Sequence, residues 1–166
     1  MEIEGAAELE ETLQALLGSL SAASRRKLSR HVARTLRKEN AARVRAQVNP
    51  DGTPYADRRP DTYRPSFRNG RALRRKIMRL RLRRKFFPKL RNASHMRAEW
   101  GAEEASVGFA NPTVARIALV HQFGLRDRVY RKGGLTADYP ERKLLGLTAD
   151  DSDAILDQVL RHFQKM

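Results

Sequence analysis

The sequence predicts an α+β fold, in which several helices pack on a small antiparallel sheet, with a long proline-rich loop and a basic segment. Three observations lead to this prediction. Apolar residues recur at helical spacing in residues 9–20, 24–48 and 155–163. Two short runs with apolar residues, 96–100 and 106–109, are separated by a glycine-containing turn, as in paired strands. A chain of 166 residues has the size of one domain, so we expect a single domain over residues 1–166.

The first 21 residues are expected to form an acidic amphipathic helix. Its apolar stripe consists of leucines, namely Leu9, Leu13, Leu16, Leu17 and Leu20. Glutamates occupy its first half, where the helix dipole favours negative charge. We interpret this helix as one that packs on its own domain, and a dedicated interaction helix is the alternative.

A second helix is expected from about Ser24 to Val48. Its apolar side is marked by Leu28, Val32, Leu36, Val44 and Val48. Arginines flank this stripe on both sides. We therefore expect one side of this helix to face the core and the rest of its surface to be strongly basic.

Residues 49–70 are expected to form an exposed loop or arm that becomes ordered in an assembly. This range holds four of the seven prolines and two of the ten glycines. It begins with Asn49-Pro50-Asp51-Gly52, a strong turn signal, because glycine adopts a positive φ easily and proline restricts the preceding position. About twenty residues without regular structure are unusual inside a compact domain and are often functional.

Residues 71–85 form the basic segment, which is the most charged part of the chain. Its cations are Arg71, Arg74, Arg75, Lys76, Arg79, Arg81, Arg83, Arg84 and Lys85. Several are like-charge pairs four residues apart, and each such pair costs an isolated helix about 0.2–0.5 kcal/mol. The segment is therefore expected to contact an external anion, either DNA backbone or an acidic partner surface.

The C-terminal part is expected to contain a strand pair and two further helices. Asn111-Pro112 predicts the start of a helix, and Gly124 predicts its end. This helix is apolar nearly all round, so we expect it at the centre of the core. A charged, glycine-containing loop is expected to follow up to Asp138. Thr148, with an acid three residues later, predicts a capping box that opens a terminal helix. The apolar face of that helix comprises Ile155, Leu156, Val159, Leu160 and Phe163.

The net charge of +15 is concentrated in the middle of the chain. Residues 1–23 carry five acids and no bases, residues 24–100 carry 25 bases and 5 acids, and residues 101–166 carry nine of each. A basic block of this size attracts polyanions, of which nucleic acid is the usual one. A solvated or partner-facing basic surface is the alternative interpretation.

The sequence contains little that points to catalysis, and we expect neither an enzyme, nor a cofactor, nor a metal site. Cysteine is absent and the four histidines are scattered. No nucleophile motif or phosphate-binding glycine loop is present. His121, on an apolar helix, is interpreted as a core or interface residue rather than a base. The helix dipole explains the acids Asp150, Asp151, Asp153 and Asp157 better than a metal does.

We also expect no membrane association. No apolar run approaches the roughly 18 residues of a membrane span. The acidic start, Met1-Glu2-Ile3-Glu4, differs from the basic start of a signal peptide. These observations predict a soluble protein that is made inside the cell.

Five segments, in this order, resemble the tail-completion (virion morphogenesis) family of tailed, contractile-type bacteriophages. They are residues 47–55, 87–91, 106–109, 117–124 and 139–151. The resemblance implies a structural virion protein that acts in tail completion and head–tail joining, located in the virion at the neck or tail end and made in the bacterial host cytoplasm. It implies other phage tail and neck proteins as partners and a ring-forming homo-oligomer, for which the resemblance favours a hexamer. Under this interpretation Val107, Phe109, His121, Phe123 and Tyr139 are core or subunit-contact residues.

Non-specific nucleic-acid binding by a stand-alone protein is the alternative function. Aromatic residues that could stack on bases flank the basic block, namely Tyr55, Tyr63, Phe67, Phe86 and Phe87. No helix-turn-helix, zinc finger or RNA-recognition signature accompanies them. Under the tail-completion interpretation, non-specific contact with DNA in the lumen of the ring is a further expectation.

Overall fold

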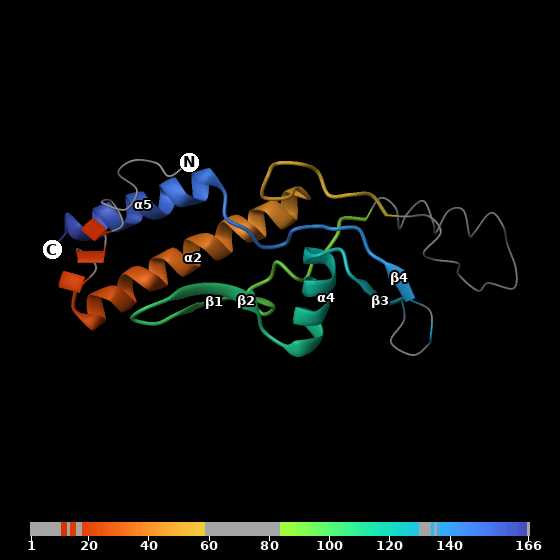
Figure 1. Cartoon of the computed structure of the whole chain (residues 1–166), viewed down its shortest axis with the longest axis horizontal. Helices are drawn as coiled ribbons and strands as arrows, with labels where there is room; N and C mark the ends of the chain where they lie inside the picture. Colours follow the sequence, from red (N-terminus) through yellow and green to blue (C-terminus); the bar gives the residue numbers. More distant parts are fainter. Residues whose placement is uncertain are drawn as a thin grey trace, which may run out of the picture.

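The computed structural model describes residues 11–12, 14–15, 18–58, 84–129, 134 and 136–165. Within these residues the elements follow the order α2 (Ala22–Ala46), β1 (Met96–Trp100), β2 (Ala105–Phe109), α4 (Pro112–Gln122), β3 (Arg126–Arg128), β4 (Thr136–Asp138) and α5 (Ala149–Phe163) (Figure 1). Two antiparallel two-stranded sheets accompany the helices. The predicted α+β class is confirmed.

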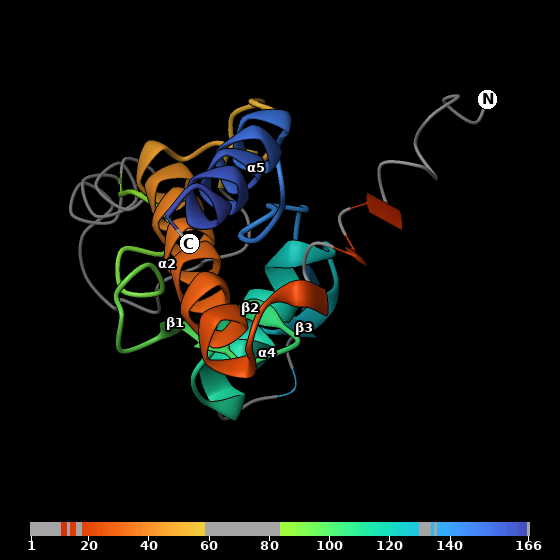
Figure 2. The ribbon, with the colours of Figure 1, turned by 90° about the vertical axis from the view of Figure 1, so that its left-hand side faces the viewer.

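Helix α2 is the element against which α5, β1 and β2 all pack. Ser21 caps its start by accepting a hydrogen bond from the backbone N–H of Ser24, and the chain leaves the helix at Gln47 with φ 67°. The helix thus begins and ends about two residues earlier than the sequence predicts. Helix α5 and the β1–β2 hairpin both pack against α2, and they lie on opposite sides of it (Figures 1 and 2).

The β1–β2 hairpin forms where the sequence predicts a strand pair. Met96 pairs with Phe109, and Trp100 pairs with Ala105 at the turn end. Because side chains alternate along a strand, Met96, Ala98 and Trp100 share one face. Met96 is fully buried, so this face is directed toward the core at Met96, whereas Trp100 at the turn end is 40% exposed.

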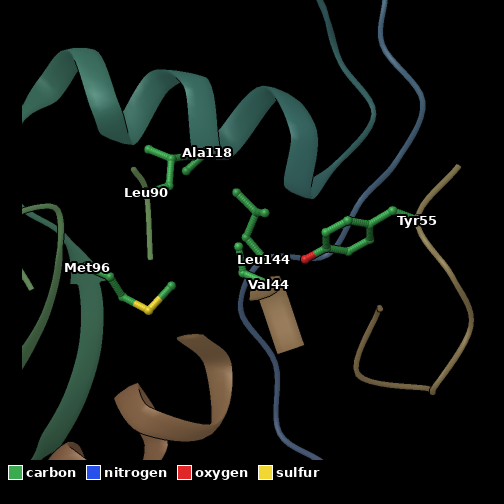
Figure 3. Packing of buried hydrophobic residues seen from close by; sticks show 6 residues of the cluster. All are labelled: Val44, Tyr55, Leu90, Met96, Ala118 and Leu144. Atoms are coloured by element: carbon green, nitrogen blue, oxygen red, sulfur yellow. The ribbon is translucent and has the colours of Figure 1, made fainter. Parts of the chain in front are cut away.

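The core is a small cluster assembled from distant parts of the chain. Its buried members are Val44, Tyr55, Leu90, Met96, Ala118 and Leu144 (Figure 3). They come from α2, the turn after it, the segment before β1, β1 itself, α4 and the segment before α5. The side chains of several loops are therefore part of the core.

Residues 49–58 agree in part with the exposed loop or arm that the sequence suggests for 49–70, since residues 51–54, 56 and 57 are exposed. The predicted turn is present, with Gly52 at φ 82°. Tyr55, however, is only 6% exposed and belongs to the core. The reason is the bridge between Val48 and Pro54, which returns the chain to the end of α2. Residues 59–70 lie outside the described part of the chain.

Helix α4 has the predicted ends but not the predicted burial. Asn111 accepts a hydrogen bond from the backbone N–H of Val114, Pro112 occupies the first turn, and Gly124 follows the helix with φ 62°. Within α4, only Ala118 and Val120 are buried, whereas Leu119 is 52% exposed. The expected position at the centre of the core is therefore correct for only one side of α4: Ala118 belongs to the core cluster, whereas the other side carries exposed apolar residues.

The segment that follows α4 contains a hairpin that the sequence analysis described as a loop. Arg126–Arg128 and Thr136–Asp138 pair antiparallel. These three-residue strands lack the β-branched and aromatic runs that indicate strands in a sequence.

Helix α5 begins with the predicted capping box between Thr148 and Asp151. Its predicted apolar face is only partly covered, since Leu156 is 42% and Leu160 49% exposed. No helix in the described part of the chain is long and apolar enough to cross a membrane.

The expected acidic N-terminal helix is described only in part. Residues 11, 12, 14, 15, 18 and 19 are helical. Leu20 is buried at 3% exposure, while Leu9, Leu13, Leu16 and Leu17 lie outside the described residues.

Candidate functional site

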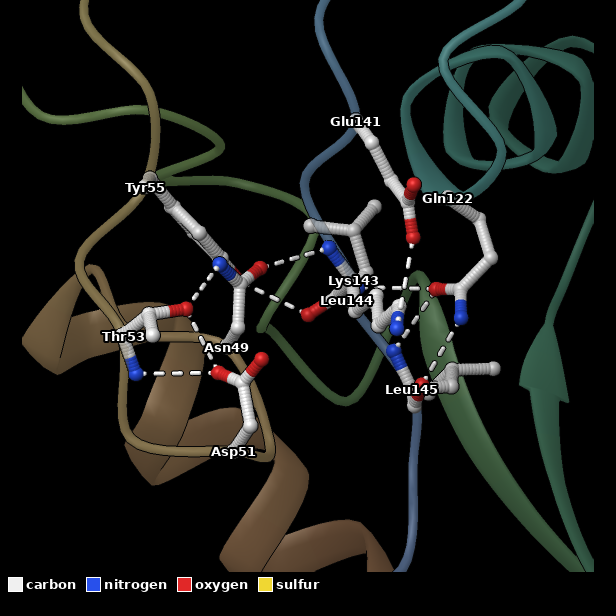
Figure 4. A network of polar contacts seen from close by, with 9 residues as sticks. All are labelled: Asn49, Asp51, Thr53, Tyr55, Gln122, Glu141, Lys143, Leu144 and Leu145. Carbon is white, nitrogen blue, oxygen red and sulfur yellow. Dashed lines mark hydrogen bonds and ion pairs between the residues drawn. The ribbon is translucent and has the colours of Figure 1, made fainter.

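The segments quoted above for the family resemblance converge on one place, the extended segment of residues 139–147, which we call the strap. The strap runs between the end of α4, the turn after α2 and the start of α5. Gln122, the last residue of α4, holds it from one side (Figure 4). Its side-chain oxygen accepts hydrogen bonds from the backbone N–H groups of Leu144 (2.8 Å) and Leu145 (3.0 Å), and its amide donates to the Leu145 carbonyl (2.8 Å).

The Asn49–Tyr55 turn holds the strap from the other side. The Asn49 side-chain oxygen accepts from the backbone N–H of Lys143 (2.8 Å), and the Tyr55 hydroxyl donates to the Lys143 carbonyl (3.2 Å). The turn is itself fixed, because Thr53 donates its backbone N–H to Asp51 (2.9 Å). Hydrogen bonds from Thr53 lower the pKa of Asp51. Turn and strap thus form one hydrogen-bonded unit (Figure 4).

Arg142 is the buried cation of the strap, at 2% exposure. Its guanidinium donates to the carbonyl oxygens of Ala56 (2.8 Å) and Asp57 (3.0 Å) and lies 4.0 Å from the centre of the Phe86 ring. A second guanidinium, that of Arg58, lies 4.2 Å from the same ring. Burial, and then the charge of Arg58, lower the pKa of Arg142 to about 10, so it remains a cation at neutral pH.

His121 and Tyr139, two of the predicted contact residues, are brought together in this site. Their ring centres are 5.0 Å apart, and Phe87 lies 4.7 Å from His121 on the other side. Burial, followed by the charges of Arg142 and Arg58, lowers the pKa of His121 to about 4. A neutral ring can accept the N–H of Arg142, whose Nη1 is 3.4 Å from Nδ1 of His121. The arrangement is that of a packed, neutral histidine.

A second polar cluster joins the end of the strap to α2 and α5. Asn40 accepts from the backbone N–H of Gly146 (2.9 Å), and Arg43 donates to the Gly146 carbonyl (2.7 Å). Arg43 also pairs with Asp151 at 2.7 Å, and both side chains are largely buried. A Cβ at position 146 would collide with the Pro50 ring, so the close approach requires glycine.

Asp151 therefore has a structural role in the capping box and in the pair with Arg43. Among the described residues no group of three or more histidines and acids is placed to hold a metal ion.

An apolar groove of about 400 Å³ is formed by residues of α4, β2 and the strap. It is lined by Phe109, Ala115, Ala118, Leu119, Gln122, Phe123 and Leu145. Phe123 is 61% exposed and Leu119 is 52% exposed. Phe109 and Phe123, both predicted contact residues, thus line the same groove, whereas Val107 packs partly buried against the core cluster.

Of the predicted basic segment, only Arg84 and Lys85 belong to the described residues, and both are exposed. The Arg84 carbonyl accepts from Arg58 (3.2 Å), and the Lys85 ammonium donates to the Arg45 carbonyl (3.4 Å). The remaining cations, from Arg71 to Arg83, lie outside the described part of the chain.

The polar residues that hold the strap were not predicted from the sequence, namely Asn40, Arg43, Gln122 and Arg142. The sequence pattern does indicate the position of Asn40. It lies midway between Leu36 and Val44 at helical spacing, so its polar side chain is on the core-facing side of α2. Arg43 and Arg142 lie in charged stretches of the sequence, where nothing indicates that either side chain is buried or which residue it contacts.

The family model for the phage virion morphogenesis family matches residues 5–164, and the chain belongs to this family. The five segments that the sequence analysis quoted for the resemblance all lie within this match. The chain is similar to tail completion protein S of Escherichia phage P2, with 38% identity over 156 residues, which cover 94% of this chain and 95% of that protein. No solved structure matches the chain.

Proposed function

We propose that this protein is a structural component that completes the phage tail and joins it to the head, as a ring at the neck or tail end. The observation that carries the proposal is the end-to-end similarity to a tail completion protein, which spans 94% of the chain. Other tail and neck proteins are the partners, and a hexamer is the ring favoured by the resemblance. A structural rather than catalytic role agrees with the rings and the cation that surround His121.

The apolar groove is the surface that we assign to subunit contacts. A ring is built from a repeated heterologous interface, in which one patch of each subunit contacts a different patch of the next. Phe123 and Leu119 are large, exposed and line the groove together with Leu145 of the strap. Fully burying an exposed side chain of this size contributes about 1.5–3 kcal/mol, and about half of each of these two side chains remains to be covered, so together they contribute on the order of 2–3 kcal/mol.

Charge introduced into the groove tests this assignment. The double variant Leu119→Glu, Phe123→Glu should abolish plaque formation when it replaces the wild-type protein, and the purified variant should have a smaller mass in solution than the wild type. Thr113→Glu, on the exposed first turn of α4 and outside the groove, is the matched control and should behave as the wild type. Normal plaques from the folded double variant would refute the assignment of the groove.

Stand-alone, non-specific DNA binding is the second candidate function, favoured by the excess of cations in residues 24–100. A protein with that function binds free duplex with a salt slope of roughly 0.9 per phosphate contacted. It would form no ring, and its loss would leave head–tail joining intact.

A further inference from the structure

The outward side of α2 carries a regular row of cations. Arg26, Arg30, Arg34 and Lys38 follow one another at intervals of four residues, and all four are exposed. Residues four apart lie above one another on a helix, so this row, which we call the basic ladder, extends over roughly 18 Å at 1.5 Å per residue.

The basic ladder is poorly neutralised by the described residues. Its ion pair is that of Lys38 with the neighbouring Glu39 at 3.8 Å, and the Lys38 side chain is 81% exposed. Like charges at this spacing destabilise a helix. A row of them on a solvent-facing surface is therefore explained better by an external anion than by the fold itself.

Trp100 lies beside the middle of the basic ladder. The guanidinium carbons of Arg30 and Arg34 are each 5.7 Å from the centre of its ring, and the side chain is 40% exposed. The ring and the cations line a shallow hollow of about 420 Å³ on this face. Cation–π contacts of this kind orient guanidinium groups while leaving their N–H donors available.

A second hollow extends the positive surface across to α5. Lys27 and His31 line both hollows, and the second, of about 380 Å³, adds Arg161, His162 and Lys165 from the end of α5. Arg161 is partly compensated by Asp157 at 2.8 Å. The cations of two helices thus form one continuous face.

We propose that this face of α2 binds the phosphate backbone of DNA without sequence specificity. It is distinct from the basic segment 71–85, and the inference goes beyond the proposed tail-completion role. DNA is favoured over an acidic protein because the hollow at the ladder is lined by cations around a single large apolar side chain. Protein interfaces are instead depleted of charge at their centre. Evenly repeated arginine forks match a repeated phosphate, and Trp100 holds two of these forks on the exposed face.

Fluorescence tests the site directly, because Trp100 is the only tryptophan in the chain. A blunt DNA duplex titrated into the full-length protein at low salt should change the Trp100 emission, and added salt should reverse the change. Polyglutamate of equal charge is the comparison ligand and should leave the emission unchanged under the same conditions. An emission that does not respond to duplex would overturn the proposal. An equal response to polyglutamate would also overturn it and would favour an acidic protein partner instead.

Two variants with the same net charge distinguish the contribution of the basic ladder to DNA binding from that of the other exposed bases. Replacing all four ladder residues by Gln should reduce the slope of log K against log salt by about 3–4, at roughly 0.9 per phosphate contact on duplex DNA. The control carries Gln at four other exposed bases, namely Arg45, Lys89, Arg97 and Arg128. Both variants lose the same net charge, and glutamine is a good helix former, so α2 should remain intact. Equal slopes for the two variants would overturn the assignment to α2.

Discussion

Gln122→Leu is the substitution that tests most sharply whether the strap is held by α4. The Gln122 side chain makes three hydrogen bonds to the strap backbone, at 2.8 Å to Leu144, and at 3.0 Å and 2.8 Å to Leu145. Leucine has a similar size but can neither accept nor donate. The substitution therefore leaves two N–H groups and one carbonyl without these partners.

The expected loss follows from the number of hydrogen bonds. A typical intramolecular hydrogen bond contributes about 0.5–1.5 kcal/mol, and an unsatisfied buried group costs about 1–3 kcal/mol. All three bonds are only partly buried, so water can replace some of them. We expect the free energy of unfolding to fall by about 3 kcal/mol, which corresponds to a melting temperature lower by roughly 6–12 °C for a domain of this size.

Thermal unfolding and hydrogen exchange measure the two parts of this expectation. The melting temperature should fall, and the backbone amides of Leu144 and Leu145 should exchange faster than in the wild type. Gln164→Leu, at an exposed position after α5, is the matched control and should change stability by less than about 0.5 kcal/mol. Unchanged protection of the two amides in Gln122→Leu would refute the role given to this side chain.

Two further predictions concern the same site. The pKa of His121 is about 4 in the folded protein and about 6.5 when unfolded. The free energy of unfolding should therefore be at its full value above pH 6.5 and should fall by up to about 3 kcal/mol as the pH is lowered toward 4. Melting curves across this range should show a smaller fall for His121→Phe and the same fall as in the wild type for the control His31→Gln. Gly124→Ala should lower the free energy of unfolding by about 1–3 kcal/mol, because φ is 62° and the new Cβ would lie 3.1 Å from the Glu141 nitrogen. Gly108→Ala is the control in a denaturant titration, because a Cβ at position 108 would have no atom within 4 Å. Equal unfolding midpoints for the two variants would contradict the prediction.

The elements that the sequence predicted well are those with local signals. Asn111-Pro112 and the pair Thr148 and Asp151 are capping patterns whose partners lie within three residues, and the structure contains both caps. Strands β1 and β2 are adjacent in sequence and joined by a short turn, so their pairing was also predictable. Local hydrogen bonding explains these successes.

The features that escaped prediction depend on distant partners. Asn40 and Gly146, whose hydrogen bond closes the second polar cluster, are 106 residues apart. Helix α4 was expected to be buried all round, but periodicity cannot distinguish a core-facing apolar side from one that remains exposed, as Leu119 and Phe123 are. Of the predicted core or contact residues, His121 lies beside Tyr139, and Phe109 and Phe123 line one groove; that these residues form subunit contacts stays a prediction.

Electron microscopy of a lysate from the parent phage with this gene inactivated tests the central claim most directly. We expect DNA-filled heads lying beside separate tails, with joining restored by the wild-type gene supplied in trans. Normal, infectious particles in the absence of the protein would contradict the tail-completion role.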